Sequence, residues 1–277
     1  MTLVLDIGGT NIRIAEVSKT SVKNKLIVPN TKKKDTFLKT IFQLIDKYPK
    51  PNKIGIGIAG FVKNGIILNS PNLPDIKNLN LAKILKSKYK CPVLVENDAN
   101  CAGLAELKYG SGKGKKNIIL LTLGTGVGGA IILNGKLYKG NGFAGEPGHM
   151  KIHEAQLESK ASGTAVIIQA RKQGIRCSNA LDVELLARQG NKKAIKIYKE
   201  VGKNIGQAIL SISYLIDPEL FILGGGFSRA PFIMEEIQKV TSKDLLKRKI
   251  NIVKAKFGDN AGLIGAGLLP PIKPKTL

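Results

Sequence analysis

Cysteine is scarce in this chain of 277 residues, and its three copies, Cys91, Cys101 and Cys177, lie far apart with no CxxC spacing. This pattern predicts neither a disulfide framework nor a cysteine zinc site and is typical of free thiols in a reducing cytoplasm. No apolar run approaches the eighteen or so residues of a membrane span. The first residues, MTLVLDIGGT, lead straight into a strand pattern without a basic leader. We therefore expect no secretory signal, no membrane partner and a cytoplasmic location.

Acidic residues are also few: 20 Asp and Glu stand against 44 Lys and Arg, which gives a formal net charge of +24. Such an excess invites comparison with nucleic-acid-binding proteins. However, the lysines are spread along the chain, and no helix-turn-helix, RNP or zinc-finger pattern accompanies them. We interpret them as a solvated basic surface that helps to attract an anionic nucleotide, and we do not expect a nucleic-acid partner.

The common nucleotide-binding motifs are missing or out of place. No GxxxxGK[ST] sequence is present, which excludes a P-loop. The dinucleotide pattern GxGxxG occurs at 55–60 and 124–129. The first copy lies inside a strand pattern and is followed by Pro71 and Pro74 rather than by an amphipathic helix, and the second copy leads into a strand. Because both lack the strand–turn–helix context, dinucleotide binding is not expected.

Two segments of the chain share one pattern. Residues 3–17 and 118–133 each read as a strand, a polar glycine-rich turn and a second strand. The two copies start about 115 residues apart, which suggests two similar α/β domains. The lysine-glycine run 110–116 is the expected boundary between them.

Hydrophobic periodicity predicts the remaining elements. Helices are expected near residues 35–48, 79–89, 99–109, 163–173, 183–189, 192–216, 232–240 and 261–268. Strands are expected near residues 54–59, 93–95, 220–223 and 250–253, with a hairpin-like stretch that ends at residue 68.

The glycine hairpins have two interpretations. Each alone is a plausible tight turn, but small residues also let backbone N–H groups approach an oxyanion closely. Thr10 and Thr125 would add hydroxyl groups to these loops, and a third glycine run, 224–226, follows another strand. Taken together, the three glycine segments favour phosphate binding over plain turns.

Five motifs, DIGGTNIR, ENDAN, TLGTGVGG, AGEPGH and LGGG, occur in this order along the chain. Their order and spacing resemble those of ROK-family sugar kinases, which are glucokinase- and hexokinase-like members of the actin-like ATPase superfamily. DIGGT alone is weakly specific, whereas the ordered set covers essentially the whole chain. The resemblance implies an α/β fold with two ribonuclease-H-like domains around a cleft, in which residues 1–110 plus 258–277 form a small domain and residues 111–257 a large one.

The resemblance further implies ATP and Mg²⁺ as cosubstrate and cofactor, a hexose substrate and a homodimer. It assigns ATP to three loops, in which the contacting residues would be Gly8, Gly9, Thr10, Asn11, Arg13, Gly124, Thr125, Gly126, Gly224, Gly225 and Gly226. Asp6 would help to hold Mg²⁺, partly through water, since Mg²⁺ prefers oxygen ligands. Arg13 could neutralise phosphate or stand as a surface cation.

Asp98 in the ENDAN motif follows an apolar strand and precedes a helix. Asn97 or Asp98 could simply cap that helix, because Asn and Asp are favoured at this position. An Asp at the end of a strand could instead accept the proton of a sugar hydroxyl during phosphoryl transfer. The resemblance implies that Asp98 is this catalytic base and that it contacts the sugar together with Asn97.

The resemblance also assigns sugar contacts to Asn72, Glu146, His149 and Glu158, whose side chains can hydrogen-bond hydroxyl groups. His153 lies outside the motif and is expected to face solvent. The family commonly carries a CxCGxxGC zinc loop after its Gly-His pair, whereas here MKIHEAQL follows His149. Two histidines are too few to bind zinc, so we expect no zinc site. Without that metal, another group must orient His149.

The activity that fits best is transfer of the γ-phosphoryl group of ATP to the 6-hydroxyl of a hexose, with glucose as the first candidate. Mannose, glucosamine and N-acetylhexosamines (N-acetylglucosamine and N-acetylmannosamine) remain open, as does polyphosphate as donor. A catalytically silent sugar-binding relative is a further alternative. A transcriptional repressor of the same family is not expected, because the chain starts at the first glycine loop and not at a winged-helix domain.

Overall fold

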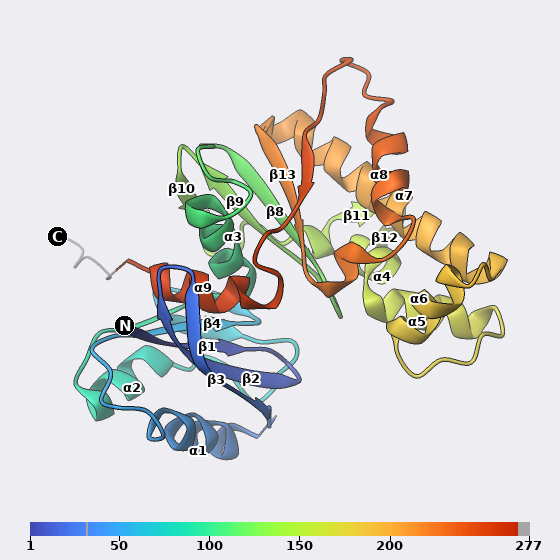
Figure 1. Ribbon diagram of the computed structural model, residues 1–277. Coiled ribbons are helices and arrows are strands. Elements are labelled where there is room, and N and C mark those ends of the chain that lie inside the picture. Colours follow the sequence, from blue (N-terminus) through green and yellow to red (C-terminus); the bar gives the residue numbers. More distant parts are fainter. Residues whose placement is uncertain (32, 271–277) are drawn as a thin grey trace. The chain divides into compact units, whose positions relative to one another are not determined.

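The computed structural model describes residues 1–31 and 33–270, which divide into two compact units (Figure 1). Within the described residues, unit 1 comprises Met1–Gly110, Lys139–Ala144 and residues 260–270, whereas unit 2 comprises Ser111–Tyr138 and Gly145–Asp259. The segment Lys139–Ala144 thus belongs to unit 1, although the residues on both sides of it belong to unit 2. Residues 271–277, which we assigned to the small domain, lie outside the described residues.

Unit 1 is built on a five-stranded sheet in the order β3-β2-β1-β4-β7. Strands β1, β2 and β3 pair antiparallel, and β1, β4 and β7 pair parallel. The strands of unit 1 are β1 (Thr2–Ile7), β2 (Asn11–Ser18), β3 (Ser21–Pro29), β4 (Ile54–Ile58), β5 (Phe61–Lys63), β6 (Ile66–Asn69) and β7 (Val93–Asn97). Its helices are α1 (Lys34–Ile45), α2 (Leu81–Tyr89), α3 (Asp98–Tyr109) and α9 (Ala261–Leu268).

At β1, both faces of this sheet are buried, since its side chains alternate between two cores. Leu5 and Ile7 of β1 pack into a core with α1 and α2, whereas Val4 packs into another with α3 and α9. Figure 1 shows these helix pairs on opposite sides of the sheet. With helices on both faces, the strands read as continuous apolar runs, as is typical of α/β proteins.

Unit 2 repeats this arrangement in the order β10-β9-β8-β13-β14. Strands β8, β9 and β10 pair antiparallel, and β8, β13 and β14 pair parallel. The strands of unit 2 are β8 (Ile118–Leu123), β9 (Val127–Leu133), β10 (Lys136–Tyr138), β11 (Lys151–Ile152), β12 (Ala155–Gln156), β13 (Leu220–Gly224) and β14 (Ile252–Lys254). Its α-helices are α4 (Leu157–Ala161), α5 (Gly163–Lys172), α6 (Ala180–Arg188), α7 (Lys192–Ile216) and α8 (Ile233–Thr241).

Short 3-10 helices complete the chain at Pro147–His149, Gly226–Arg229 and Gly258–Asn260. The same order of two antiparallel pairings followed by two parallel pairings occurs in both sheets. This repetition confirms the predicted α/β class with two ribonuclease-H-like units, and it explains why the two glycine hairpins share one sequence pattern. Each hairpin is the β1–β2 or β8–β9 connection of its unit.

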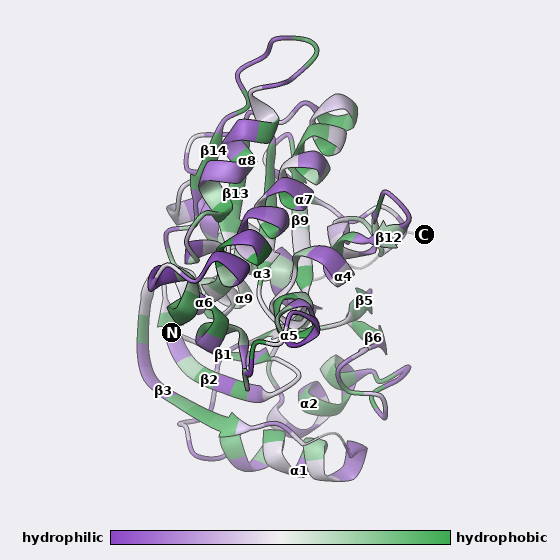
Figure 2. Cartoon of the chain, turned by 90° about the vertical axis from the view of Figure 1, so that its right-hand side faces the viewer, coloured by the Kyte–Doolittle hydropathy of each residue, from purple (hydrophilic) through white to green (hydrophobic). Residues whose placement is uncertain are grey.

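Helix α7 shows how the sequence specifies an element of unit 2. The prediction of a helix at 192–216 is confirmed, and the buried residues Ile197, Val201 and Ile205 recur at the spacing of one helix face. Asn191 caps the helix by accepting hydrogen bonds from the N–H groups of Lys193 and Ala194. Figure 2 shows hydrophilic and hydrophobic bands alternating along α7 and α8.

Strand β3 was not expected from the sequence. It lies at the edge of the sheet, and most of its side chains are exposed. Because few of its residues are buried, its sequence shows no alternation of apolar and polar residues. Among the described residues, no helix is long and apolar enough to cross a membrane.

Candidate functional site

In unit 1, three predicted site residues, Asp6, Asn97 and Asp98, lie at one edge of the sheet. Strands β1, β4 and β7 run parallel and adjacent, so their carboxyl ends meet. Asp6 lies near the end of β1, Gly60 follows β4, and Asn97 ends β7 immediately before Asp98. Ligands of open parallel sheets bind at this edge, because the loops that follow the strands converge there.

Asp98 is the first residue of α3. Its Oδ1 atom accepts a hydrogen bond from the backbone N–H of Ala99 at 2.9 Å. Burial raises the pKa of Asp98 to about 6, and the negative charge of Asp6 adds to this rise, whereas backbone hydrogen bonds lower it. Asp98 is therefore a stronger base than an ordinary carboxylate, yet it is still ionised at neutral pH.

Asn97, and not Asp98, caps helix α3. Its Oδ1 atom accepts from the N–H of Asn100 at 3.0 Å, and its Nδ2 atom donates to the carbonyl of Gly60 at 3.1 Å. The capping function that the sequence offered to either residue thus falls to Asn97. Asp98 is therefore not the capping residue of α3. Asn97 uses one amide N–H for Gly60 and keeps the other for a ligand.

Asp6 is buried and pairs with Arg13, the residue opposite it on β2. Arg13 Nη1 donates to Asp6 Oδ2 at 2.9 Å. Mg²⁺ in phosphoryl-transfer sites is bound through one or two carboxylates, water and substrate phosphates. The hard oxygen donors of Asp6, close enough to Asp98 to raise its pKa, fit an ion held in this manner.

The first glycine loop is held by a residue that the sequence analysis missed. Asn30, just after β3, donates from Nδ2 to the carbonyl of Gly8 at 2.6 Å and from its backbone N–H to the carbonyl of Thr10 at 2.8 Å. Gly8 in turn donates to the carbonyl of Asn11 at 2.9 Å. Because β3 gave no sequence signal, nothing pointed to Asn30, although it fixes both ends of the Gly8–Thr10 turn.

Asn72, a predicted sugar contact, packs directly against this loop. A Cβ atom on Gly9 would lie 2.5 Å from Asn72 Cβ, so only glycine fits there. The segment is held by buried Ser70, which donates to the carbonyl of Ala59 at 2.6 Å and accepts at its own carbonyl from the N–H of Leu73. The structure therefore brings Asn72, Gly9 and the end of β4 together within unit 1.

In unit 2, the second glycine loop is bound to the start of helix α5. The carbonyl of Gly124 accepts from the N–H of Gly163 at 2.8 Å. The carbonyl of Thr125 accepts from the N–H and the Oγ1 atom of Thr164, the latter at 2.9 Å. These carbonyls are therefore already bonded within unit 2, and Gly163 and Thr164 are further residues that the sequence analysis missed.

Glu158 of α4 contacts the same loop. Its Oε2 atom accepts from the N–H of Val127 at 2.9 Å, and a Cβ atom on Gly126 would lie 2.2 Å from that oxygen. The predicted sugar contact and the predicted phosphate loop are thus adjacent in unit 2. The sequence analysis assigned both but did not predict that they touch.

Glu146 precedes the short 3-10 helix Pro147–His149, and His149 is the last residue of that helix. The His149 N–H donates to the carbonyl of Glu146 at 3.2 Å, and Gly148 packs against the carbonyl of Val127. His153 is exposed at the turn between β11 and β12, as expected. Residues 1–31 and 33–270 contain no group of three or more His, Cys, Asp or Glu side chains that could hold a metal ion. The absence of a zinc site stays a prediction.

The third glycine run ends β13, which pairs with β8. Gly225 has a φ of +81°, and a Cβ atom there would lie 2.2 Å from the carbonyl oxygen of Leu123. Beside it is a hollow of about 260 Å³. The lining residues come from the end of β13 and from the segment after β14: Gly225, Gly226, Arg229, Lys256, Phe257, Gly258 and Asp259. Gly225 therefore connects the second and third glycine segments, and the hollow adds cationic and aromatic side chains that no motif had indicated.

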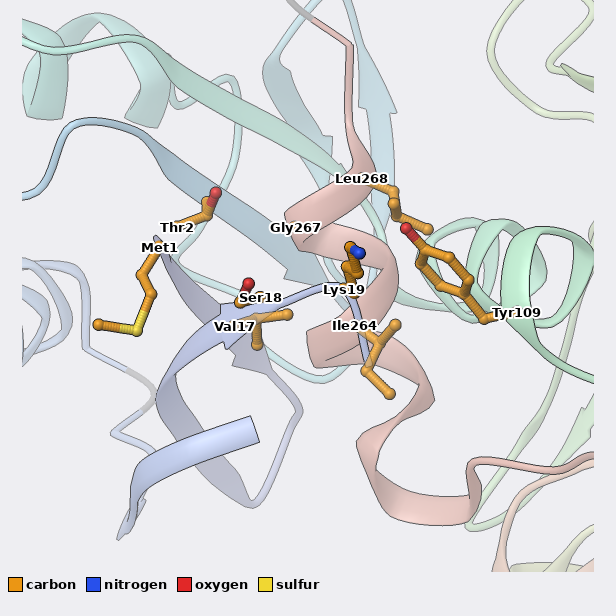
Figure 3. A pocket seen from close by; sticks show the side chains of 9 residues that line it. All are labelled: Met1, Thr2, Val17, Ser18, Lys19, Tyr109, Ile264, Gly267 and Leu268. Atoms are coloured by element: carbon orange, nitrogen blue, oxygen red, sulfur yellow. The ribbon is translucent and has the colours of Figure 1, made fainter. Parts of the chain in front are cut away.

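A second pocket, of about 200 Å³, lies in unit 1 (Figure 3). It is lined by residues from the start of β1, the turn after β2, and the ends of α3 and α9: Met1, Thr2, Val17, Ser18, Lys19, Tyr109, Ile264, Gly267 and Leu268. Thr2 begins β1, whereas Asp6 lies near its other end. This pocket contains none of the predicted site residues and is separate from the carboxyl edge of the sheet.

Comparisons with known proteins agree with this arrangement. The ROK family model matches residues 2–271. A glucokinase of Streptomyces coelicolor is 30% identical over 96% of both chains, and an N-acetyl-D-glucosamine kinase of Vibrio cholerae is 29% identical over 95% of this chain and 97% of its own. Among solved structures, a ROK family glucokinase from Streptomyces griseus, in complex with glucose and AMPPNP, superposes with a TM-score of 0.84 at 28% identity, covering 96% and 97% of the two chains.

Proposed function

This chain belongs to the ROK family, and on that premise we propose that it is a sugar kinase that transfers the γ-phosphoryl group of ATP to the 6-hydroxyl of a hexose. Its relatives include a glucokinase and an N-acetyl-D-glucosamine kinase, and the solved glucokinase holds glucose and an ATP analogue. These similarities support a sugar as acceptor and ATP as donor. The 6-hydroxyl and the choice of hexose are our inference.

The observation that carries the proposal is the position and pKa of Asp98. A base for a sugar hydroxyl must be ionised at neutral pH and still accept a proton readily, and a pKa of about 6 meets both needs. In the proposed reaction, the sugar 6-oxygen attacks the γ-phosphorus of ATP, and the hydroxyl proton passes to Asp98. The bond between the γ-phosphorus and the oxygen that bridges it to the β-phosphate breaks. The products are the sugar 6-phosphate and ADP.

The glycine loops supply the phosphate contacts in this proposal. Phosphoryl transfer depends mainly on positioning and on neutralisation of charge, and closely approaching N–H groups provide both. The loops are Gly8, Gly9, Thr10 and Asn11 in unit 1 and Gly124, Thr125 and Gly126 in unit 2, with Gly224, Gly225 and Gly226 beside the nucleoside. Mg²⁺ bound near Asp6 would neutralise phosphate charge. Arg13 pairs with Asp6, and we propose that it orients this carboxylate as well as contributing positive charge.

The sugar would be bound by Asn72, Asn97 and Asp98 of unit 1 and by Glu146, His149 and Glu158 of unit 2. Carboxylate and amide groups recognise hydroxyls well, because they offer paired donors and acceptors. The contacts already seen between Asn72 and Gly9, and between Glu158 and Gly126, support this assignment. In each unit, a proposed sugar ligand lies against a proposed phosphate loop.

An N-acetylhexosamine is the second candidate substrate. The N-acetyl-D-glucosamine kinase of Vibrio cholerae is 29% identical to this chain and the glucokinase is 30% identical, so the similarity does not separate the two activities. We therefore treat the substituent at the sugar 2-position as the variable to be measured.

The test is a coupled assay of ADP formation with Mg-ATP and a panel of glucose, mannose, glucosamine, N-acetylglucosamine and N-acetylmannosamine. The accepted sugar is then compared with its 6-deoxy analogue, which lacks the proposed acceptor hydroxyl and should give no ADP above the background. Phosphorus NMR of the product identifies the phosphorylated oxygen. Turnover of the 6-deoxy sugar would show that another hydroxyl accepts the phosphoryl group.

A parallel assay replaces ATP by polyphosphate. Activity with polyphosphate alone would overturn ATP as donor, and binding of a sugar without turnover by either donor would identify a catalytically silent protein. The homodimer that the resemblance implies stays a prediction, which light scattering of the purified protein would test.

A further inference from the structure

A buried carboxylate, Glu96, lies two residues before the proposed catalytic base. Glu96, on β7, is only 5% exposed, and its Oε1 atom accepts from the backbone N–H of Asn97 at 3.0 Å and from Asn100 Nδ2 at 3.1 Å. One oxygen therefore binds residues on both sides of Asp98. The two hydrogen bonds fix the path of the chain as it passes from β7 into α3.

The second oxygen of Glu96 pairs with Lys139. Lys139 Nζ lies 2.9 Å from Glu96 Oε2 and is about half exposed, at 48%. Exposed ion pairs contribute little to stability, but removing one partner from a buried charge leaves that charge uncompensated. Here the carboxylate is buried and bonded on its other oxygen, so loss of Lys139 would disturb the contacts that Glu96 makes.

Lys139 begins the segment Lys139–Ala144, which belongs to unit 1 although it lies between two parts of unit 2 in the sequence. The carbonyl of Lys139 accepts from the N–H groups of Gly142 at 2.7 Å and Ala144 at 3.3 Å, which closes a tight turn. Phe143 packs on Phe61 of β5 with 5.3 Å between ring centroids. The segment is thus attached to unit 1 at both ends, by an ion pair and by an aromatic contact.

The chain then returns to unit 2 through Gly145, whose φ is +88°, and continues directly to Glu146, a proposed sugar ligand. Asn100 belongs to the same polar network as Glu96. Its Oδ1 atom is buried and has no hydrogen-bond partner within the described part of the chain, while its Nδ2 atom binds Glu96.

We propose that Glu96 and Lys139 form a positioning pair, which fixes the Asn97–Asp98 turn for proton transfer and joins to it the segment that leads to Glu146. Neither residue touches a reacting atom in this role. The inference rests on the proposed function for its kinetic consequence, but the positioning itself can be measured without any turnover.

The first measurement is backbone hydrogen exchange of the full-length protein, with peptides that cover residues 96–100. Lys139→Met should speed exchange in these peptides, because Glu96 loses its partner and the N–H bonds of the turn loosen. Lys139→Arg restores the positive charge and should restore protection. Lys136→Met, an exposed lysine on β10 in the same stretch of sequence, removes the same charge and should leave exchange as in the wild type. Wild-type exchange in Lys139→Met would overturn the proposal.

The second measurement is steady-state kinetics of the same variants. Lys139→Met should lower kcat roughly tenfold and raise the KM for sugar, while the KM for ATP stays near that of the wild type, since neither glycine loop is touched. Lys139→Arg should recover most of the loss. A change in the KM for ATP alone would contradict the positioning role.

A double-mutant cycle adds an independent check. Glu96→Gln in the wild type places an amide N–H against the Lys139 ammonium, whereas in the Lys139→Met background that conflict is gone. Glu96→Gln should therefore lower kcat much less in the Lys139→Met background than in the wild type. Additive losses of kcat would show that the two residues act separately. If exchange responds as expected and the wild type phosphorylates no sugar, the positioning pair stands and the proposed function fails.

Discussion

The Oε2 atom of Glu158 lies 2.9 Å from the N–H of Val127, and it also occupies the space next to Gly126 where a side chain would have to go. A residue proposed to bind sugar therefore restrains the loop proposed to bind phosphate. Both partners lie within unit 2, so this relationship is a property of one compact body. Through this contact, a change in the loop should move the Glu158 carboxylate and so alter the proposed sugar binding.

Substitution of Gly126 by Ala tests this contact. The added methyl group would lie 2.2 Å from Glu158 Oε2, which is too close, so the carboxylate must move. We expect kcat/KM for sugar to fall by about 10²-fold, as misplacement by about 1 Å can produce. Gly124→Ala is the matched variant, because its methyl group meets no atom within 4 Å, and it should retain the wild-type KM for sugar. Equal losses of sugar affinity in both variants would contradict the role of Glu158.

Replacement of Asp98 by Asn should remove the proposed base. The amide keeps the size of the side chain but cannot accept the hydroxyl proton, so turnover should fall by about 10²–10⁴-fold. Sugar binding, measured by calorimetry, should change little. Asp75→Asn, which neutralises an exposed aspartate in the same unit, should turn over like the wild type. Turnover near the wild-type value in the Asp98 variant would refute its assignment as base.

The same substitution has a pH-dependent effect on stability. The folded protein raises the pKa of Asp98 from 3.8 to about 6, so ionisation of Asp98 opposes folding. The resulting loss in free energy of unfolding is absent below about pH 4, grows between about pH 4 and pH 6, and is constant above that range. Asp98→Asn should therefore raise the melting temperature of the ligand-free protein at pH 8, and the gain should disappear near pH 4. An equal shift at both pH values would mean that the gain has another cause.

Much of the fold could be predicted, because several strands are buried along nearly all of their length. Strands such as β1 and β8 then read as apolar runs, and α7 shows its buried face at helical spacing. Strand β3 could not be predicted, since its exposed side chains carry no such pattern.

Candidate site residues could be proposed from the sequence where a motif contains them, as at Asp98, whose role stays a prediction. The site was not predictable where one residue supports another across the fold, because such contacts depend on tertiary packing and not on local spacing. Two such contacts are the hydrogen bond from Asn30 to the first glycine loop and the ion pair of Lys139 with Glu96. Glu96 itself lay inside a recognised motif, yet only the structure shows that its carboxylate binds both sides of Asp98.

Asn30→Ala tests the support of the first glycine loop. The substitution removes the side-chain hydrogen bond to Gly8 but leaves the backbone bond to Thr10. Loss of one such bond is worth about 1 kcal/mol, so the KM for ATP should rise about fivefold while the KM for sugar changes little. The exposed residue Asn52 offers a control, and Asn52→Ala should behave like the wild type. An unchanged KM for ATP in Asn30→Ala would show that the loop holds its shape without the side chain.

Removal of metal should separate magnesium from zinc. The chain has only two histidines, His149 and His153. Its three cysteines lie at positions 91, 101 and 177, so none occurs in the segment 150–157 that stands in place of the family's zinc loop. Zinc sites in proteins use four ligands drawn mainly from such side chains, so no structural zinc is expected. Treatment with EDTA followed by dialysis should leave the melting temperature unchanged, and Mg²⁺ alone should restore full kinase activity. A fall in melting temperature that only Zn²⁺ reverses would reveal a zinc site built from other ligands, and that metal would then be the group that orients His149.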